Sequence, residues 1–209
     1  MRIVVFGASG NTGTQVVRQA LDAGHLVTAY VRDPTRLSIA QENLRIFQGD
    51  ISNAPLVGEA ITDQEAVLST LGAQSPFKYD RVVVEGMSHI LRAMESQDVK
   101  RLIYLSVAGV NEARRGAGFL IKYIAPWLLR TEVRGHLERE NMIRKSSIDW
   151  TIVRATTLTN GPHTGEYRTG VNLQSRSFMA KISRADVADF MVNQITSRQY
   201  IRQAPRIMY

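Results

Sequence analysis

The sequence predicts an α/β fold, with one doubly wound parallel sheet, helices on both of its faces and a small C-terminal extension. Short apolar runs alternate with stretches of helical periodicity as far as Arg154, which is typical of right-handed βαβ units. The first apolar run leads directly into a glycine-rich turn, "FGASGNTG". The chain has 209 residues, of which 44% are hydrophobic, enough for a core of ordinary size. We therefore expect a single domain over residues 1–209, with residues 156–182 as a small lobe.

The first βαβ unit occupies the N-terminal part of the chain. Residues 2–6, "RIVVF", are an uninterrupted apolar run, as expected of a strand that is buried on both faces. Residues 11–23 follow as a helix, Gly24 ends it, and residues 25–32 form the second strand. The helix should face the sheet through Val16, Val17, Ala20 and Leu21.

The alternation continues with a strand at 44–50, a short helix at 55–61 and a strand at 66–72. Because a helix separates these strands, the sheet should be parallel. A longer helix is predicted at 79–97 from the helical spacing of its apolar residues. Those residues are Val83, Met87, Ile90 or Leu91, and Met94.

The remaining strands of the sheet are predicted at 101–109 and 149–155. Residues 120–145 lie between them and are expected to be largely helical, with a break at Pro126. Residues 160–182 are typical of turns and short strands.

A last helix is predicted to begin after Ser183. Asp186 stands three residues later and would complete a capping box with the serine. The residues expected to face inward are Val187, Phe190, Met191 and Ile195.

Composition narrows the classes of function. The chain has no cysteine, which excludes disulfides, thiolate catalysis and cysteine-bound metals and favours the cytoplasm. No apolar run is long enough to span a membrane, the N-terminus has no signal-peptide pattern, and no His/Asp/Glu cluster has metal-binding spacing. The net charge of +7 leaves three interpretations open: nucleic-acid binding, excess surface arginine, or a positive site for phosphorylated or carboxylated ligands.

Three glycines, Gly7, Gly10 and Gly13, follow the first strand at intervals of three residues. In a strand–turn–helix context this spacing predicts a pyrophosphate site, because the first N–H groups of the helix lack intrahelical partners and the helix dipole favours anions. The first glycine permits the turn, the second lets the phosphate approach, and the third lets the helix pack closely. Side-chain donors at the same rim are Ser9, Asn11 and Thr12. The alternative is a purely structural turn.

Two arginines follow the second strand, in "AYVRDPTRL". An NAD site usually has an acidic residue here to bind the ribose 2′-hydroxyl, whereas this chain has Arg32 and, one short turn later, Arg36. Guanidinium groups suit a 2′-phosphate, so the pattern favours NADP over NAD. Asp33 is expected to cap the turn at Pro34. The alternative is a pair of solvated surface arginines.

Seven segments of the chain resemble, in order and spacing, the atypical short-chain dehydrogenases. They read "VVFGASGNTG", "YVRDPTRL", "FQGDISN", "LSTLG", "LIYLSVAG", "WTIVRATTLTNGP" and "TGEYR". The chain most resembles the branch that holds the NADPH-dependent flavin reductases, the biliverdin reductase B type and the NmrA-like proteins. The resemblance spans nearly the whole chain and implies a Rossmann-type fold and NADP(H) as cofactor.

The resemblance also implies roles for individual residues. It places the pyrophosphate at the glycine turn and the 2′-phosphate at Arg32 and Arg36. Ser106 would lie beside the nicotinamide and is the candidate catalytic residue, together with Tyr123 as a pocket residue. The alternatives are a strand-end hydroxyl for Ser106 and a packed side chain for Tyr123. The other implied cofactor contacts are Asp50 and Ile51 at the adenine, Leu71 and Gly72 along the cofactor, and Ala155, Thr156 and Thr157 at the carboxamide.

Two features separate this chain from its relatives. The biliverdin reductase B type has proline, proline and histidine at the positions of Ala155, Thr156 and Thr157, although His136 matches another histidine of that type. Biliverdin activity is therefore not expected. No tyrosine is followed four residues later by lysine, so the Tyr-x-x-x-Lys proton-transfer pair of ordinary short-chain dehydrogenases is absent. Hydride transfer to a flavin or quinone does not require that pair, because positioning supplies most of the rate.

Residues 111–134 follow the fifth strand and mix basic side chains with Phe119, Tyr123 and Trp127. Ligands of open α/β sheets bind beyond the carboxyl ends of the strands, so this segment is placed to act as a lid that suits a planar anion such as FMN. The alternative is an amphipathic helix that docks on the domain or makes a subunit contact. Nucleic-acid binding is disfavoured, because the basic residues are scattered and no reading module is present.

Together these features predict an NADPH-dependent oxidoreductase that transfers hydride to a flavin, a quinone or a similar planar, anionic acceptor. The alternative is a non-catalytic NmrA-like protein that binds NADP and signals to a partner. An isomerase or epimerase with bound NAD is disfavoured, because those enzymes usually keep the tyrosine. We expect a cytoplasmic monomer or small homo-oligomer with no nucleic-acid or membrane partner.

Overall fold

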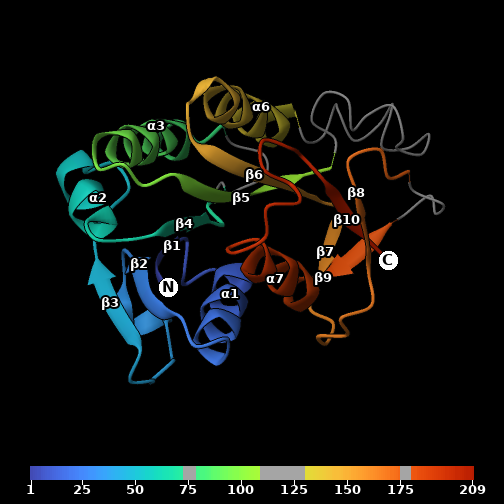
Figure 1. The fold of residues 1–209 in the computed structure, drawn as a ribbon, viewed down its shortest axis with the longest axis horizontal. Helices are drawn as coiled ribbons and strands as arrows, with labels where there is room; N and C mark the ends of the chain where they lie inside the picture. The colour runs from blue at the N-terminus through green and yellow to red at the C-terminus, as the bar shows by residue number, and fades with distance from the viewer. Residues whose placement is uncertain (73–78, 109–129, 175–179) are drawn as a thin grey trace.

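The computed structural model describes residues 1–72, 79–108, 130–174 and 180–209. Within them, eight strands form one sheet in the order β3-β2-β1-β4-β5-β6-β10-β8 (Figure 1), and β7 and β9 form a two-stranded sheet. The eight-stranded sheet is parallel except for β8, which runs antiparallel to β10. The strands are β1 (Arg2–Phe6), β2 (Leu26–Val31), β3 (Leu44–Gln48), β4 (Ala66–Ser69), β5 (Arg101–Val107), β6 (Asp149–Ala155), β7 (Thr157–Thr159), β8 (Arg168–Gly170), β9 (Lys181–Ser183) and β10 (Arg206–Met208).

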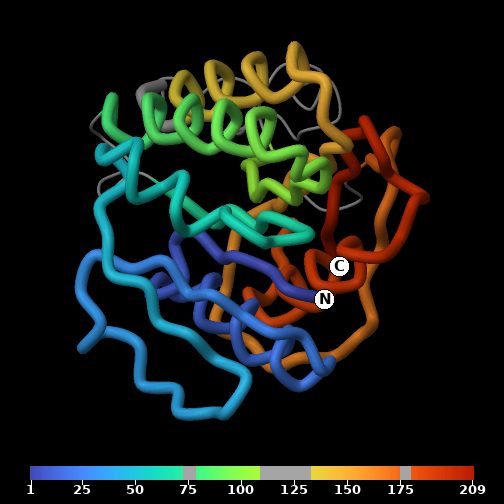
Figure 2. The backbone as a smooth tube through the Cα atoms, turned by 60° about the vertical axis from the view of Figure 1, so that its left-hand side comes forward, coloured from blue at the N-terminus to red at the C-terminus, as the bar shows by residue number. Residues whose placement is uncertain are grey.

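Helices cover both faces of this sheet, which confirms the predicted doubly wound α/β fold. Helices α1 and α7 pack together on one face, and α2, α3 and α6 form a row on the other (Figure 1). Figure 2 shows α3 and α6 side by side. None of the helices in the described part of the chain is long and apolar enough to cross a membrane. The helices are α1 (Asn11–Asp22), the 3₁₀ turn η1 (Pro34–Arg36), α2 (Ala54–Ile61), α3 (Arg81–Ser96), α6 (Arg130–Lys145) and α7 (Arg184–Asn193).

Two apolar clusters hold the layers together. Side chains alternate along a strand, so Ile3 and Val5 of β1 pack toward α1 and α7, whereas Val4 and Phe6 pack toward α2 and α3. The residues predicted to face the sheet from α1 and α3 are all buried.

One predicted strand bound needs correction, one strand was not predicted, and one predicted helix is described only in part. Strand β4 ends at Ser69 rather than at residue 72, which leaves Leu71 and Gly72 in the loop that follows. The short strand β10 was not predicted; it pairs with β6 through Arg206 and Ile207. The helix predicted at 120–145 is described only from Arg130 onward, so its first part and Pro126 lie outside the described residues.

Candidate cofactor-binding site

The glycine turn joins β1 to α1. Gly7 has φ 82°, a left-handed conformation that favours glycine, and its carbonyl accepts a hydrogen bond from Gly10 N (3.0 Å). Gly10 is the N-cap of α1 and has no side chain with which to bond the first turn of the helix. No side chain therefore caps the first N–H groups of α1, which is the arrangement that an anion site requires; the pyrophosphate site itself stays a prediction.

Gly13 brings α1 against the turn. A Cβ atom at this position would overlap the carbonyl oxygen of Gly7 and lie 2.8 Å from its carbonyl carbon. At Gly10 the nearest atom to a Cβ would be that same oxygen, at 3.2 Å. The third glycine is thus required for packing, whereas the second faces outward and is exposed. Of the polar side chains at the rim, Ser9 and Asn11 reach the surface and Thr12 is buried.

The loop after β4 closes over the same turn. The hydroxyl of Thr70 lies within hydrogen-bond distance of the carbonyl oxygens of Phe6 (3.3 Å) and Gly7 (3.2 Å). This contact places Leu71, half-buried, and Gly72, exposed, next to the glycine turn. Their position along a bound cofactor stays a prediction.

The two arginines after β2 are exposed; Arg32 precedes η1 and Arg36 is its last residue. The carboxylate of Asp33 accepts hydrogen bonds from the backbone N (3.0 Å) and the hydroxyl (2.6 Å) of Thr35. Asp33 therefore caps the turn, as predicted, and these bonds hold its pKa below the usual value. Arg32 and Arg36 stand at the carboxyl end of β2, beside the glycine turn at the end of β1.

Asp50 follows the neighbouring strand β3. Hydrogen bonds from Ser52 are the main cause of its lowered pKa, to which the charge of Arg32 also contributes. Its backbone carbonyl accepts a hydrogen bond from the hydroxyl of Tyr30 (2.8 Å). The ring of Tyr30 fills the space where a side chain at Gly49 would lie. Ile51, the other predicted adenine contact, is buried in the core.

A buried polar cluster lies at the carboxyl ends of β5 and β6. The hydroxyl of Ser106 donates to the carboxylate of Glu140 (2.8 Å). Arg154 contacts both oxygens of that carboxylate, at 3.1 and 2.6 Å. The hydroxyl of Tyr104 lies 2.7 Å from Nδ1 of His136, and Ser106 Oγ lies 3.5 Å from the same nitrogen. We call these five residues, each less than 5% exposed, the Ser106 cluster.

The charges in the Ser106 cluster are set by burial. Burial, and to a lesser extent the charge of Arg139, lowers the pKa of His136 well below its usual value, so the imidazole is neutral. Glu140 and Arg154 form a two-pronged ion pair, the strong form of a charge-assisted hydrogen bond. Ser106 therefore bonds a side-chain carboxylate and not the backbone; its place beside the nicotinamide stays a prediction.

Sequence reasoning selected Ser106 and His136 but missed Glu140 and Arg154. A signal was present: Arg154 follows the apolar residues Ile152 and Val153 within the predicted strand "DWTIVRA", and a charge in a buried strand needs a partner. Glu140 follows His136 by one helical turn and so lies on the same face of α6.

The remaining predicted residues lie close to this cluster or outside the described part of the chain. Ala155 is buried at the end of β6, Thr156 is half-buried and Thr157 is exposed at the start of β7. The carbonyl of Ala155 accepts from Ala108 N (2.7 Å), which ties the ends of β5 and β6 together. Tyr123 and most of the predicted lid at 111–134 lie outside the described residues.

One buried carboxylate, that of Asp186, joins the loop between β7 and β8 to α7. Ser183 caps α7 as predicted, since its Oγ accepts from Asp186 N (2.9 Å). The predicted capping box is incomplete, because Ser183 N donates to the hydroxyl of Tyr209 (3.2 Å) instead. The Asp186 carboxylate accepts from the backbone N of Thr164 (2.8 Å) and Gly165 (2.9 Å) and from Tyr209 (2.6 Å). It thereby fixes the loop between β7 and β8 to α7.

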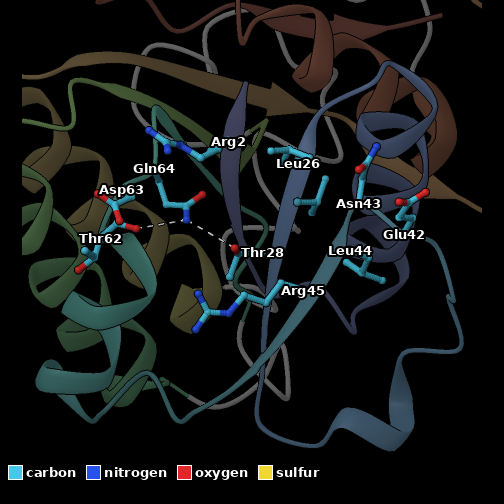
Figure 3. Close-up of a pocket in the computed structure, with 11 residues that line it drawn as sticks. Arg2, Leu26, Thr28, Glu42, Asn43, Leu44, Arg45, Thr62, Asp63 and Gln64 are labelled. Carbon is cyan, nitrogen blue, oxygen red and sulfur yellow. Dashed lines mark hydrogen bonds between the residues drawn. The ribbon is translucent and has the colours of Figure 1, made fainter.

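A surface pocket of about 370 Å³ lies elsewhere, where β1, β2 and β3 begin (Figure 3). Ligands of open α/β sheets bind beyond the carboxyl ends of the strands, so this pocket at their amino ends does not coincide with the predicted cofactor site. The described residues hold no group of three or more His, Asp or Glu side chains arranged to bind a metal ion. The pocket is lined by Arg2, Leu26, Val27, Thr28, Glu42, Asn43, Leu44, Arg45, Thr62, Asp63 and Gln64.

Comparison with known proteins agrees with this geometry. The profile of a protein family described as NAD(P)H-binding matches residues 7–198. An uncharacterised chloroplast protein of Arabidopsis thaliana is 29% identical over 209 residues, which cover 95% of this chain and 73% of that protein.

Two solved structures share the fold. A short-chain dehydrogenase/reductase from Veillonella parvula, in complex with NADP, matches with a TM-score of 0.81 and 23% identity over 99% of this chain and 93% of that one. The anaerobilin reductase ChuY from Escherichia coli O157:H7 matches with a TM-score of 0.82 and 21% identity over 99% and 96%. The Rossmann-type fold is thereby confirmed.

Proposed function

We propose that this chain, which belongs to the NAD(P)H-binding family, is an NADPH-dependent reductase of a flavin, a quinone or a similar planar acceptor. The observation that carries the proposal is the turn between β1 and α1. Its N-cap is a glycine with no side-chain bond to the helix, and Gly13 allows the helix to pack against the turn. This is a cradle for a diphosphate.

The residues that would hold NADPH follow from this cradle. The backbone of Gly7, Gly10 and Gly13, with Ser9, Asn11 and Thr12 around it, would bind the pyrophosphate. Arg32 and Arg36 would bind the 2′-phosphate, which is the group that separates NADPH from NADH. At the other end, Ser106 would lie beside the nicotinamide and residues 155–157 at its carboxamide. Leu71 and Gly72 would lie along the cofactor, and Asp50 and Ile51 at the adenine.

The proposed class of acceptor follows from the lack of an obvious side-chain proton donor. The chain has no Tyr-x-x-x-Lys pair, and in this structure the hydroxyl of Ser106 is engaged with Glu140. NADPH supplies hydride when bound, and an electron-poor ring accepts it without a protein acid. The protein's part is then to align two planar rings. The name of ChuY, a reductase with the same fold, supports the reductase class.

Two measurements test the proposal. Calorimetric titration should show NADPH binding, and NADPH oxidation followed at 340 nm should depend on added FMN, riboflavin or a quinone. Binding without turnover across the acceptor panel would favour the NmrA-like sensor. Absence of NADPH binding would contradict both functions.

Arginine substitution tests the cofactor preference. Arg32→Ala with Arg36→Ala should weaken NADPH binding roughly 100-fold and NADH binding little, because charge-assisted bonds to the 2′-phosphate are lost. Arg18→Ala is the matched control, since Arg18 is an exposed arginine on α1. An equal loss for NADPH and NADH would refute the assignment of the 2′-phosphate.

A further inference from the structure

Helix α6 carries a buried charge that the proposed function does not use. Arg139 is 2% exposed. Its Nε donates to the carbonyl of Gly135 (3.0 Å) and its Nη1 to the carbonyl of Leu71 (2.8 Å). The guanidinium carbon lies 5.7 Å from the ring centroid of Tyr104. Within the described ranges, Arg139 forms no ion pair with a carboxylate.

The neighbouring groups do not cancel this charge. Glu140, the next residue, is paired with Arg154, and His136 is neutral. Arg144 approaches Glu140 at 3.7 Å, but its side chain is 35% exposed and adds only positive charge. Near the carboxyl ends of β5 and β6, the described buried groups therefore leave the positive charge of Arg139 uncompensated. Another buried guanidinium, that of Arg101, lies at the opposite end of β5, where it bonds the carbonyl of Gln194.

The buried charge of Arg139 lowers the stability of the fold, and it lies close to the proposed nicotinamide site. A buried charge without a counter-ion is unfavourable, and carbonyl groups and an aromatic ring offset only part of the cost. Arg139 bonds Leu71, which the proposed function places along the cofactor, and its neighbour Glu140 bonds Ser106, which the proposed function places beside the nicotinamide. Arg139 therefore lies behind Leu71 and one residue away from the group that holds Ser106.

We propose that Arg139 makes the site prefer the reduced cofactor to the oxidised one. The inference rests on the proposed function. The nicotinamide ring of NADP⁺ carries a positive charge and that of NADPH carries none, so a fixed cation behind the ring disfavours NADP⁺ alone. This charge favours the uptake of NADPH and the release of NADP⁺, as a reductase requires. Arg139 is a positioning residue, because it holds Leu71 and acts on the nicotinamide only through the electric field of its charge.

The test is the ratio of two dissociation constants, measured by calorimetry with NADPH and NADP⁺. Two unit charges about 10 Å apart at an effective dielectric of about 20 change an equilibrium roughly tenfold. The wild-type protein should therefore bind NADPH roughly tenfold more tightly than NADP⁺. Arg139→Gln should bring the ratio near one, whereas Arg139→Lys, which keeps the charge, should preserve most of it.

Controls separate the charge from general damage. Arg134→Gln removes a cation from the exposed face of the same helix and should leave the ratio unchanged. A structural defect would weaken both nucleotides alike, so the ratio reports the charge. An unchanged ratio in a folded Arg139→Gln variant overturns the inference. If that variant does not fold, the wild-type ratio decides: near one overturns the inference, near ten supports it. Failure to bind either nucleotide refutes the proposed function itself.

Discussion

The two ends of the candidate site are built in different ways. At the end of β1, the glycine turn uses the backbone of a few consecutive residues, and steric fit decides which residues are allowed. At the ends of β5 and β6, side chains from three elements form the Ser106 cluster, and charge pairing decides. The first kind of site is specified locally, and the second depends on the tertiary structure. Substitutions should therefore act through shape at one end and through charge at the other.

The largest effect is expected at the charged end. Glu140→Ala leaves Arg154 buried beside an empty position, and breaking a buried pair costs about 3–5 kcal/mol of unfolding free energy. Glu138→Ala is the control, because Glu138 pairs with Arg134 on the exposed face of α6 and should matter little. Urea unfolding measures both. A similar small loss for the two variants would mean that charge pairing does not hold this end together.

A smaller loss is expected at the glycine end, for a steric reason. Gly13→Ala forces a Cβ atom against the backbone of Gly7 and should cost about 3 kcal/mol. Gly10→Ala should fold normally, since its Cβ would meet one atom at 3.2 Å. Gly10→Val should also fold but lose NADPH binding, because its side chain fills the proposed phosphate position. Tight NADPH binding by folded Gly10→Val would refute the claim that steric fit governs the glycine end of the site.

A third region, around Asp186 at the start of α7, also depends on a buried charge. Burial alone would raise the pKa of Asp186, but hydrogen bonds from Tyr209, Gly165 and Thr164 together lower it to about 2. The carboxylate thus contributes stability above its unfolded pKa of 3.8, and this stability is lost as the pH falls toward 2.

Asp186→Asn should therefore cost about 2 kcal/mol at pH 7 and little at pH 2. Asp189→Asn, one turn later on α7 and 24% exposed, should cost less at pH 7. Urea titrations at the two pH values measure these differences. Equal losses for the two variants at pH 7 would show that the buried bonds of Asp186 are not what holds the loop.

The smallest effect concerns the neutral imidazole of His136. Its pKa in the folded protein is lowered, so protons bind the unfolded chain preferentially as the pH falls below about 6.5. Acidification from pH 7 to pH 5.5 should cost the wild type about 1.4 kcal/mol through this residue. His136→Gln should lose that part of the pH dependence, as followed by melting temperature. An unaltered slope in the variant would mean that His136 is protonated within the fold.

The same contrast explains what the sequence could predict. The glycine turn, the Asp33 cap and the Ser183 cap are patterns of nearby residues, and each forms the local structure expected. Alternation of apolar runs with helical segments was sufficient to predict the existence of β1 to β6 and their parallel pairing, because strands that are joined through a helix run parallel.

The missing parts depend on partners far apart in the chain. Strand β10 has three residues and gains its place by pairing with β6, so no local pattern marks it. The Ser106–Glu140 and Glu140–Arg154 contacts join α6 to two strands, and helical spacing alone could not pair them. Asp186 was predicted as a cap, but its loop contacts lie more than twenty residues away.

The ring of Tyr30 over Gly49 has an evolutionary consequence. The ring occupies the space that any side chain at position 49 would need, and its hydroxyl fixes the start of the loop after β3. Related chains should therefore covary at these two positions: those that keep an aromatic residue at position 30 should keep glycine at position 49, and alanine or serine should occur at 49 only where the ring has been lost.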